Sequence, residues 1–95
     1  MNYTLTLSQI SDMKHTIGFS RDNVTGKKNP KYKAYRNYFC TTENCDDFDS
    51  LVDLVDKGLM FSRQNGTQGW FFHLSKEGFK VLSEITEVDI QEEEE

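Results

Sequence analysis

This chain is poor in the features that mark membrane and exported proteins. No apolar run approaches the roughly 18 residues of a spanning helix, and the first residues show no basic region followed by an apolar stretch. The composition therefore predicts a protein that does not enter membranes, is not exported and resides in the cytoplasm. Only two cysteines are present. In an intracellular protein, Cys40 and Cys45 are expected to be free thiols.

Acidic and basic side chains are divided unevenly along the chain. Residues 1–42 hold seven Lys and Arg against two Asp and Glu, whereas residues 43–95 hold four against fourteen. The net charge of −5 argues against a protein that coats nucleic acid generally. The basic first part still leaves room for a local cationic surface.

The first half of the chain predicts one helix and two extended segments. Apolar and polar residues alternate over residues 2–7, which indicates a short strand or an extended arm. Ser8 is expected to cap a helix over residues 9–17, where apolar residues recur at helical spacing. Residues 20–34 are polar and interrupted by glycine and proline, so we expect a loop. Residues 34–42 are rich in aromatics and threonine and indicate a strand.

A second helix is predicted over residues 46–57. Four apolar residues there are spaced i, i+3, i+4 and i+7, as on the buried stripe of a surface helix. They are Phe48, Leu51, Val52 and Val55. Asn44 or Thr42 is expected to cap this helix, and Lys57 followed by Gly58 is expected to end it.

The segment after this helix indicates a hairpin and a third helix. Two apolar runs within residues 59–74 are joined by a polar stretch that contains Asn65-Gly66, a strong hairpin signal. Ser75 is expected to cap a helix over residues 76–86. Gly78 lies inside that helix, where glycine is unfavourable, so we expect it to permit a close packing contact.

This helix–hairpin–helix segment resembles the second half of winged-helix regulators, including those of the multiple-antibiotic-resistance type. The matching residues are Lys57, Gly58 and Leu59, then Leu74, Ser75, Gly78 and Leu82. The resemblance covers about a third of the chain. It implies a small α+β, winged-helix-like domain with three helices and a short antiparallel sheet that includes a wing hairpin, residues 59–74. A full winged helix has one more helix before the wing, for which this chain has no room.

The chain also resembles small proteins of bacterial viruses and prophages. The residues that carry this likeness are Met13-Lys14-His15, Gly18 and Arg36-Asn37-Tyr38-Phe39. The resemblance implies a viral protein in the cytoplasm of a bacterial host. We expect one domain over residues 1–86, followed by a frayed acidic tail, residues 87–95.

The helix in the position that would read DNA is acidic. Its carboxylates are Asp46, Asp47, Asp49, Asp53 and Asp56. These side chains oppose phosphate, so the resemblance does not carry a DNA-reading role to this helix. The first functional hypothesis is a non-enzymatic accessory protein that presents this acidic surface to a basic protein partner, as an anti-defence, anti-CRISPR-like inhibitor would. The alternative interpretation of the same residues is an ordinary solvated helix face.

The second functional hypothesis is a DNA-binding winged-helix transcriptional regulator. It would use the basic loop and the wing instead of the helix. The candidate nucleic-acid contacts are Lys27, Lys28, Lys31, Lys33, Arg36 and Arg63. A solvated loop explains the lysines equally simply. The sequence leaves the oligomeric state open.

The thiols and imidazoles predict neither a metal site nor an enzyme. Cys40 and Cys45 with His15 and His73 are of the types that bind zinc, but the histidines are not spaced as a ligand pair. A Cys–His catalytic pair lacks a nucleophile turn, an oxyanion glycine pattern or a phosphate loop. We therefore expect no catalytic residue, no metal and no cofactor.

Three consecutive aromatics lie in the second strand of the hairpin. Trp70, Phe71 and Phe72 would form a partner-binding patch if they were exposed. A strand more often places one of two neighbouring aromatics in the core. We therefore expect Phe71 or a neighbour to pack against Leu51 and Val55.

Overall fold

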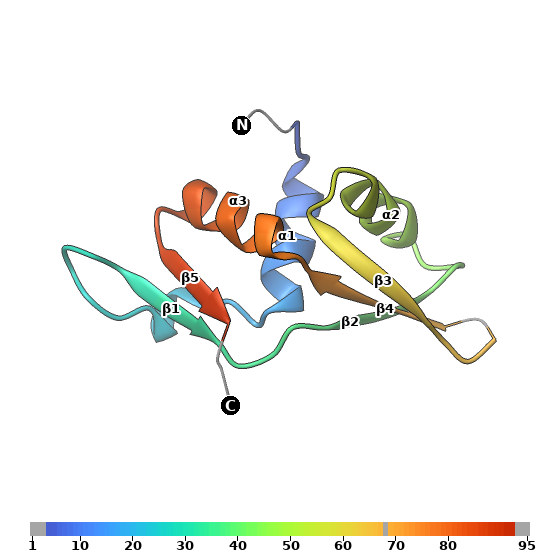
Figure 1. The fold of residues 1–95 in the computed structure, drawn as a ribbon, viewed down its shortest axis with the longest axis horizontal. Coiled ribbons are helices and arrows are strands. Elements are labelled where there is room, and N and C mark those ends of the chain that lie inside the picture. The colour runs from blue at the N-terminus through green and yellow to red at the C-terminus, as the bar shows by residue number, and fades with distance from the viewer. Residues whose placement is uncertain (1–3, 68, 93–95) are drawn as a thin grey trace.

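Three helices and two small sheets form the part of the chain that the computed structural model describes, residues 4–67 and 69–92. The elements are α1 (Leu7–Thr16), β1 (Lys31–Ala34), β2 (Phe39–Thr42), α2 (Phe48–Asp56), β3 (Met60–Asn65), β4 (Gly69–Leu74), α3 (Lys76–Thr86) and β5 (Asp89–Glu92) (Figure 1). One sheet is antiparallel with strand order β2–β4–β3, and the other is a parallel pair, β1–β5. The predicted α+β class with three helices and an antiparallel sheet is confirmed. The parallel pair was not predicted.

Helix α2 forms where the apolar spacing predicts it. Leu51 and Leu54 are fully buried, and the helix ends at Lys57 and Gly58, whose φ of 78° is one that glycine adopts at little cost. The predicted cap was wrong. The cap position belongs to Asp47, whose side chain accepts no hydrogen bond from the helix, and neither Thr42 nor Asn44 takes this position.

The hairpin predicted over residues 59–74 is confirmed as β3 and β4. The register pairs Met60 with Leu74 and Phe61 with His73, and β2 adds to the other edge of β4 with Phe39 opposite Phe72. Successive residues of a strand point to opposite faces. One face of this sheet therefore holds Phe72 and Leu74, and the other holds their neighbours Phe71 and His73.

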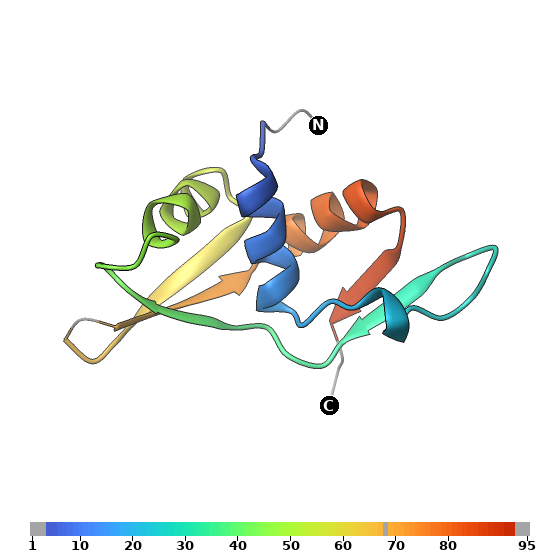
Figure 2. The ribbon, with the colours of Figure 1, turned by 180° about the vertical axis from the view of Figure 1, so that it is seen from behind.

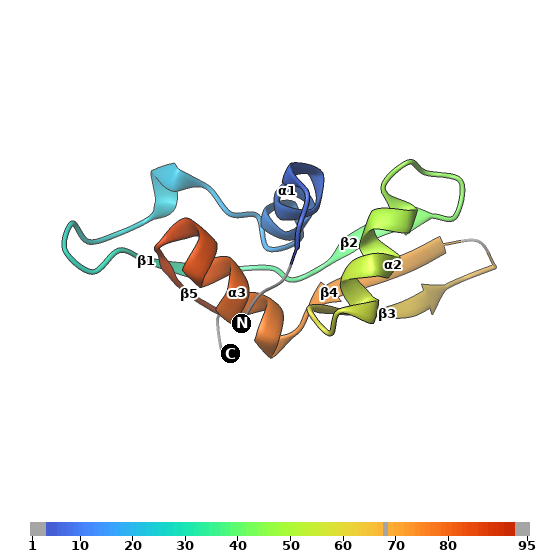
Figure 3. The same ribbon diagram turned by 90° about the horizontal axis from the view of Figure 1, so that it is seen from above.

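The helices cover one face of the β2–β4–β3 sheet. Phe48 of α2 packs on the rings of Trp70 and Phe72, with centroid separations of 6.3 and 5.9 Å. Seen from above, α2 lies over the hairpin (Figure 3). In Figure 1 no described helix or strand lies beneath the sheet. The predicted burial of one of the neighbouring aromatics is confirmed for Phe72, which is 1 % exposed.

Helix α1 stands between α2 and α3 (Figure 2). It begins earlier than predicted because Thr6, not Ser8, is its cap. The side chains of Thr6 and Gln9 each accept a hydrogen bond from the other's backbone N–H, at 3.0 Å, which forms a capping box. The predicted extended arm is therefore wrong at Leu7, which is helical. Residues 1–3 of that arm lie outside the described residues.

Helix α3 has the predicted bounds and the predicted cap. The Ser75 hydroxyl accepts from the Gly78 N–H at 3.0 Å. Gly78 is buried, and a Cβ there would overlap the Leu59 carbonyl oxygen and the Leu74 side chain. The close approach predicted from Gly78 is therefore confirmed.

The largest corrections concern the two segments predicted as loop and tail. Within residues 20–34 the chain forms a short 3₁₀ helix, Arg21–Asn23, and then β1, which ends at Ala34. β1 pairs in parallel with β5, so the frayed tail is wrong at residues 89–92. Val88 and Ile90 are 2 and 4 % exposed. Burial of these two apolar side chains holds a segment that its charge alone marks as disordered. Residues 93–95 lie outside the described part.

The predicted strand over residues 34–42 is also divided. Residues 34 and 39–42 belong to β1 and β2, which lie in different sheets, and residues 35–38 link them. The molecule is elongated, 45 × 31 × 20 Å, with the hairpin tip and the loop before β1 at opposite ends (Figure 1). None of the described helices has the length and apolar character needed to span a bilayer.

Candidate functional site

The predicted acidic residues lie together along the turn before α2 and along α2 itself. We call this set the acidic ridge, and it consists of Asp46, Asp47, Asp49, Asp53 and Asp56. Four of them are exposed. Asp53 is half-buried, pairs with Lys57 and accepts a hydrogen bond from the Gln9 amide at 2.7 Å. The hydrogen bond from Lys57, and then the one from Gln9, lower the pKa of Asp53. Asp53 thus forms its interactions within the protein, and the other four carboxylates are free to contact a partner.

A buried carboxyl lies close to the acidic ridge. Asp12 of α1 is 8 % exposed, and its Oδ2 has no hydrogen-bond partner among the described residues. Burial, and then the negative charge of Asp47, raise its pKa to about 6, while His15 opposes that shift. The protonation of Asp12 is therefore linked to the charge of the ridge.

The predicted lysine contacts lie at the far end of the molecule, in and after the loop that precedes β1. Lys27, Lys28, Lys31 and Lys33 are all exposed. Strand β5 lies beside them, with Asp89 opposite Lys31 and Gln91 opposite Lys33 in the register. The acidic strand therefore offsets part of the positive charge that the sequence assigned to this surface.

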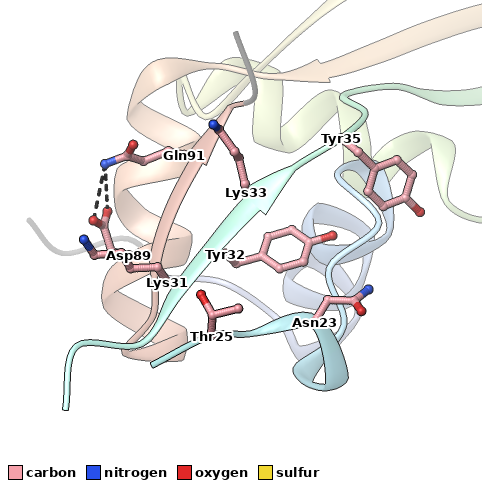
Figure 4. A pocket seen from close by; sticks show the side chains of 8 residues that line it. All are labelled: Asn23, Thr25, Lys31, Tyr32, Lys33, Tyr35, Asp89 and Gln91. Atoms are coloured by element: carbon pink, nitrogen blue, oxygen red, sulfur yellow. Dashed lines mark hydrogen bonds between the residues drawn. The ribbon is translucent and has the colours of Figure 1, made fainter. Parts of the chain in front are cut away.

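A shallow depression of about 470 Å³ opens beside these lysines (Figure 4). Its lining is Asn23, Thr25, Lys31, Tyr32, Lys33, Tyr35, Asp89 and Gln91. The Tyr32 hydroxyl donates to the Gly18 carbonyl at 2.7 Å, and the Gln91 amide donates to Asp89. These side chains thus form hydrogen bonds within the fold. No histidine, serine or cysteine is among the residues that line the depression.

Aromatic rings gather on the uncovered face of the β2–β4–β3 sheet. We call this the open face, and define it by Tyr38, Cys40, Phe61, Arg63, Phe71 and His73. The register sets Phe61 beside His73, and it sets Arg63 and Cys40 on either side of Phe71. The Phe61 and His73 rings stack with centroids 4.9 Å apart, and Tyr38 meets Phe71 edge-on at 6.5 Å. Phe61 is 52 % exposed and Tyr38 is 50 % exposed.

The two arginines predicted as nucleic-acid contacts are attached to these rings. The Arg63 guanidinium lies 5.0 Å from the Phe71 centroid. The Arg36 guanidinium lies 5.7 Å from the Tyr38 centroid and 5.9 Å from that of Tyr35, and it donates to the His15 carbonyl at 2.7 Å. The structure thus brings Arg36 and Arg63 to one aromatic surface and leaves the four lysines apart from it.

Asn37 fixes the end of β4 that carries His73. Its side-chain amide accepts from the Leu74 N–H at 2.6 Å and donates to the Leu74 carbonyl at 3.0 Å, as a paired strand would. The Asn37 carbonyl lies 2.7 Å from His73 Nδ1. A carbonyl only accepts, so Nδ1 carries the proton of the neutral ring and Nε2 is its acceptor.

The thiols and imidazoles do not form a metal centre in the described chain. Among residues 4–67 and 69–92, no three His, Cys, Asp or Glu side chains are placed to hold a metal ion. Cys40 lies on the open face, whereas the exposed Cys45 contacts the Thr42 hydroxyl at 3.4 Å. Hydrogen bonds with Thr41 and Thr42 lower the pKa of the Cys45 thiol.

Sequence reasoning found only part of the open face. It named Phe71, Arg36 and Arg63, but it missed Phe61, Tyr38 and His73 as members of the same surface. The alternation in β3 and β4 was the available signal, since it separates Phe71 and His73 from Phe72 and Leu74. That signal gives two sets of side chains but does not say which set the helices cover.

Comparisons of this chain with protein-family models, with curated proteins and with solved structures found no match. The two resemblances described above therefore rest on the residues that carry them.

Proposed function

We propose that this protein is a non-enzymatic binding protein that attaches through its acidic ridge to a basic surface of a larger macromolecular machine. The observation that carries the proposal is the group of four exposed carboxylates in the turn before α2 and along α2, of which none forms an ion pair within the described residues. Such a surface attracts a basic partner over long distances and speeds the encounter.

The resemblance to small proteins of bacterial viruses suggests what the machine is. Nucleases and other defence enzymes hold nucleic acid in basic grooves, and a row of carboxylates has the charge to occupy such a groove. We therefore favour an anti-defence, anti-CRISPR-like inhibitor in a bacterial cytoplasm. The fold supports the ridge, because Phe48 of α2 packs on Phe72 of the sheet and Leu51 of α2 is fully buried.

The test is capture of partners from bacterial lysate by immobilised protein. The ridge variant replaces Asp46, Asp47, Asp49 and Asp56 with Asn. A matched control replaces Glu84 and Glu87, two exposed carboxylates of α3 and its end, with Gln. We expect the wild type and the control to retain a partner in a salt-sensitive manner and the ridge variant to lose it. Retention by the ridge variant would refute the proposal.

The second candidate is a DNA-binding winged-helix regulator. The order α2, β3, β4, with β2 on the free edge of β4, favours it, because the hairpin then follows the helix as a wing does. The hairpin and the loop that carries the lysines lie at opposite ends of the molecule (Figure 1). This separation argues against a single DNA contact made by both. Titration of random duplex DNA at low and raised salt tests it, with Lys27, Lys28, Lys31 and Lys33 changed to Glu. No binding at low salt would exclude this candidate.

A further inference from the structure

The open face is built differently from an ordinary solvated sheet surface. Antiparallel sheets with one free face normally place polar side chains there. Here the central strand β4 presents Phe71 and His73, and β3 adds Phe61. The half-exposed rings of Phe61 and Tyr38 flank them on either side. This leaves a continuous aromatic surface without a covering element in the described chain.

The charge of this face has one sign. The positions of β2, β3 and β4 that point to it include Arg63 and no acidic residue. Arg36 joins it through Tyr38, and neither guanidinium pairs with a carboxylate of the described residues. The nearest recorded carboxylate contact is that of Glu92 with the Asn37 amide, 3.2 Å, at the edge of the face. The charge thus suits an anionic partner.

The arrangement of rings and guanidiniums indicates the chemical class of that anionic partner. Unstacked nucleobases present flat π-surfaces that stack on aromatic side chains, and the phosphates between them match arginine. The Phe61–His73 stack offers one stacking position. The Arg63 guanidinium, which lies over the Phe71 ring, offers a second flat surface for a base, and Arg36 lies by Tyr38 on the other side of the face. An acidic peptide would satisfy the arginines but would leave the half-exposed ring of Phe61 without a flat partner.

We propose that the open face of the β2–β4–β3 sheet binds single-stranded nucleic acid. One base stacks on the Phe61–His73 pair, a second stacks on the Arg63 guanidinium that lies over Phe71, and Arg63 and Arg36 hold phosphates. A duplex keeps its bases stacked on each other, so it does not offer them to this surface. The proposal is independent of the acidic ridge, which lies on α2 at the covered face. Either one can fail while the other holds.

The experiment measures fluorescence anisotropy of labelled dT12 and rU12, with a duplex of the same length as a competitor. Changing Phe61 or Phe71 to Ala is expected to weaken binding at least about fivefold, because each stacked base is worth that much or more. Changing the exposed Ile85 of α3 to Ala is the matched control and is expected to leave affinity unchanged. The dT12 and rU12 arms distinguish a DNA from an RNA ligand, and binding of either supports the proposal.

A salt series identifies the phosphate contact. A single-strand contact contributes a slope of about −0.7 in the logarithm of affinity against that of salt, so Arg63→Gln is expected to flatten the slope by about that amount. Lys80→Gln, on the exposed side of α3, is the matched control and is expected to keep the slope. Circular dichroism of each variant checks that it folds.

Three outcomes overturn the proposal. The first is that neither dT12 nor rU12 binds at about 50 mM salt. A protein partner would then be the expected ligand of the open face. The second is equal binding of duplex and single strands with no loss in Phe61→Ala and Phe71→Ala, which would reduce the contact to general charge attraction. The third is a concentration-dependent dimer, seen by sedimentation, that Phe61→Ala dissociates, because a second copy would then cover the face.

Discussion

Phe71 and Phe72 are neighbours in β4, yet they lie in opposite environments. Phe72 is 1 % exposed and packs against Phe48 of α2, whereas Phe71 is half-buried on the open face under the Arg63 guanidinium. The acidic ridge belongs to the helices on the first side, and Arg63 belongs to the second. Arg36 lies at the edge between them, where it donates to the His15 carbonyl of α1 and contacts the Tyr38 ring. The sheet therefore separates a covered side with surplus negative charge from an aromatic side with positive charge. Burial and charge therefore follow the sheet face, not the position along the chain.

The largest expected difference between the two sides of the sheet is the loss of stability in Phe72→Ala compared with that in Phe71→Ala. We expect Phe72→Ala to lower the free energy of unfolding by about 3–5 kcal/mol, because it removes a fully buried ring. Phe71→Ala is expected to cost about 1 kcal/mol, since its ring is only partly removed from water. Urea unfolding measures both. Equal losses would show that the two faces are buried alike.

Asn37→Ala tests how the end of β4 that carries His73 is held at the edge of the open face. The change leaves the N–H and carbonyl of Leu74 without their partners, and a lost buried hydrogen bond costs about 1–3 kcal/mol. Asn44→Ala is the control, since Asn44 is exposed in the turn before α2. Urea unfolding is the measurement. A cost for Asn37→Ala no larger than that of the control would mean that the amide does not hold β4.

Asp12→Asn tests whether ionisation of this buried carboxyl, next to the acidic ridge, lowers the free energy of unfolding. The folded-state pKa is about 6 against an ordinary value of 3.8, so the folded protein favours the protonated carboxyl. This contribution to stability is present below pH 4 and is lost as the pH rises towards 6 and beyond. Asn stays neutral, so Asp12→Asn is expected to add on the order of 1 kcal/mol at pH 7.5 and little at pH 4.

Unfolding of wild type and Asp12→Asn over this pH range gives the difference between them. Asp47→Asn is expected to shift the wild-type profile in the same direction but less, because the Asp47 charge is the second cause of the raised pKa, after burial. A difference between Asp12→Asn and wild type that stays constant from pH 4 to 7.5 would contradict the link.

The smallest expected effect separates the members of the acidic ridge. Asp53→Asn loses the pairing with Lys57, so we expect a slight fall in melting temperature, reduced by salt. Asp56→Asn is the control and is expected to leave the melting temperature unchanged or slightly higher, since a carboxylate in the last turn of α2 is unfavourable at the negative end of the helix dipole. Calorimetry at low and high salt measures both. Identical behaviour of the two variants would mean that Asp53 is as solvated as the rest of the ridge.

Local signals predicted α2, the hairpin and α3, and they did so at nearly their observed bounds. Ser75 and Gly58 act within a few residues of themselves, as caps and turns do, so their effects are readable from the sequence. Thr6 shows the limit of such signals. Thr6 and Ser8 are both good caps, and the partner Gln9 decides between them.

One of the two candidate surfaces could be predicted from the sequence, and the other could not. The acidic ridge is readable because its residues are close in sequence, although Gln9 of α1 removes Asp53 from it. The open face is not readable, because Tyr38, Phe61 and Phe71 come from three strands that only the register of the sheet brings together.

Periodicity, caps and composition act over short stretches. The class of the fold, the helix–hairpin–helix frame and the uneven charge can therefore be predicted from the chain alone. Contacts between distant elements pair Asp89–Glu92 with β1, place α2 over the Phe72 side of the sheet and leave the Phe71 side open. Strand alternation defines two faces equally well. The choice between them follows from where α2 buries Phe48 and Leu51, a contact between elements that no local pattern encodes.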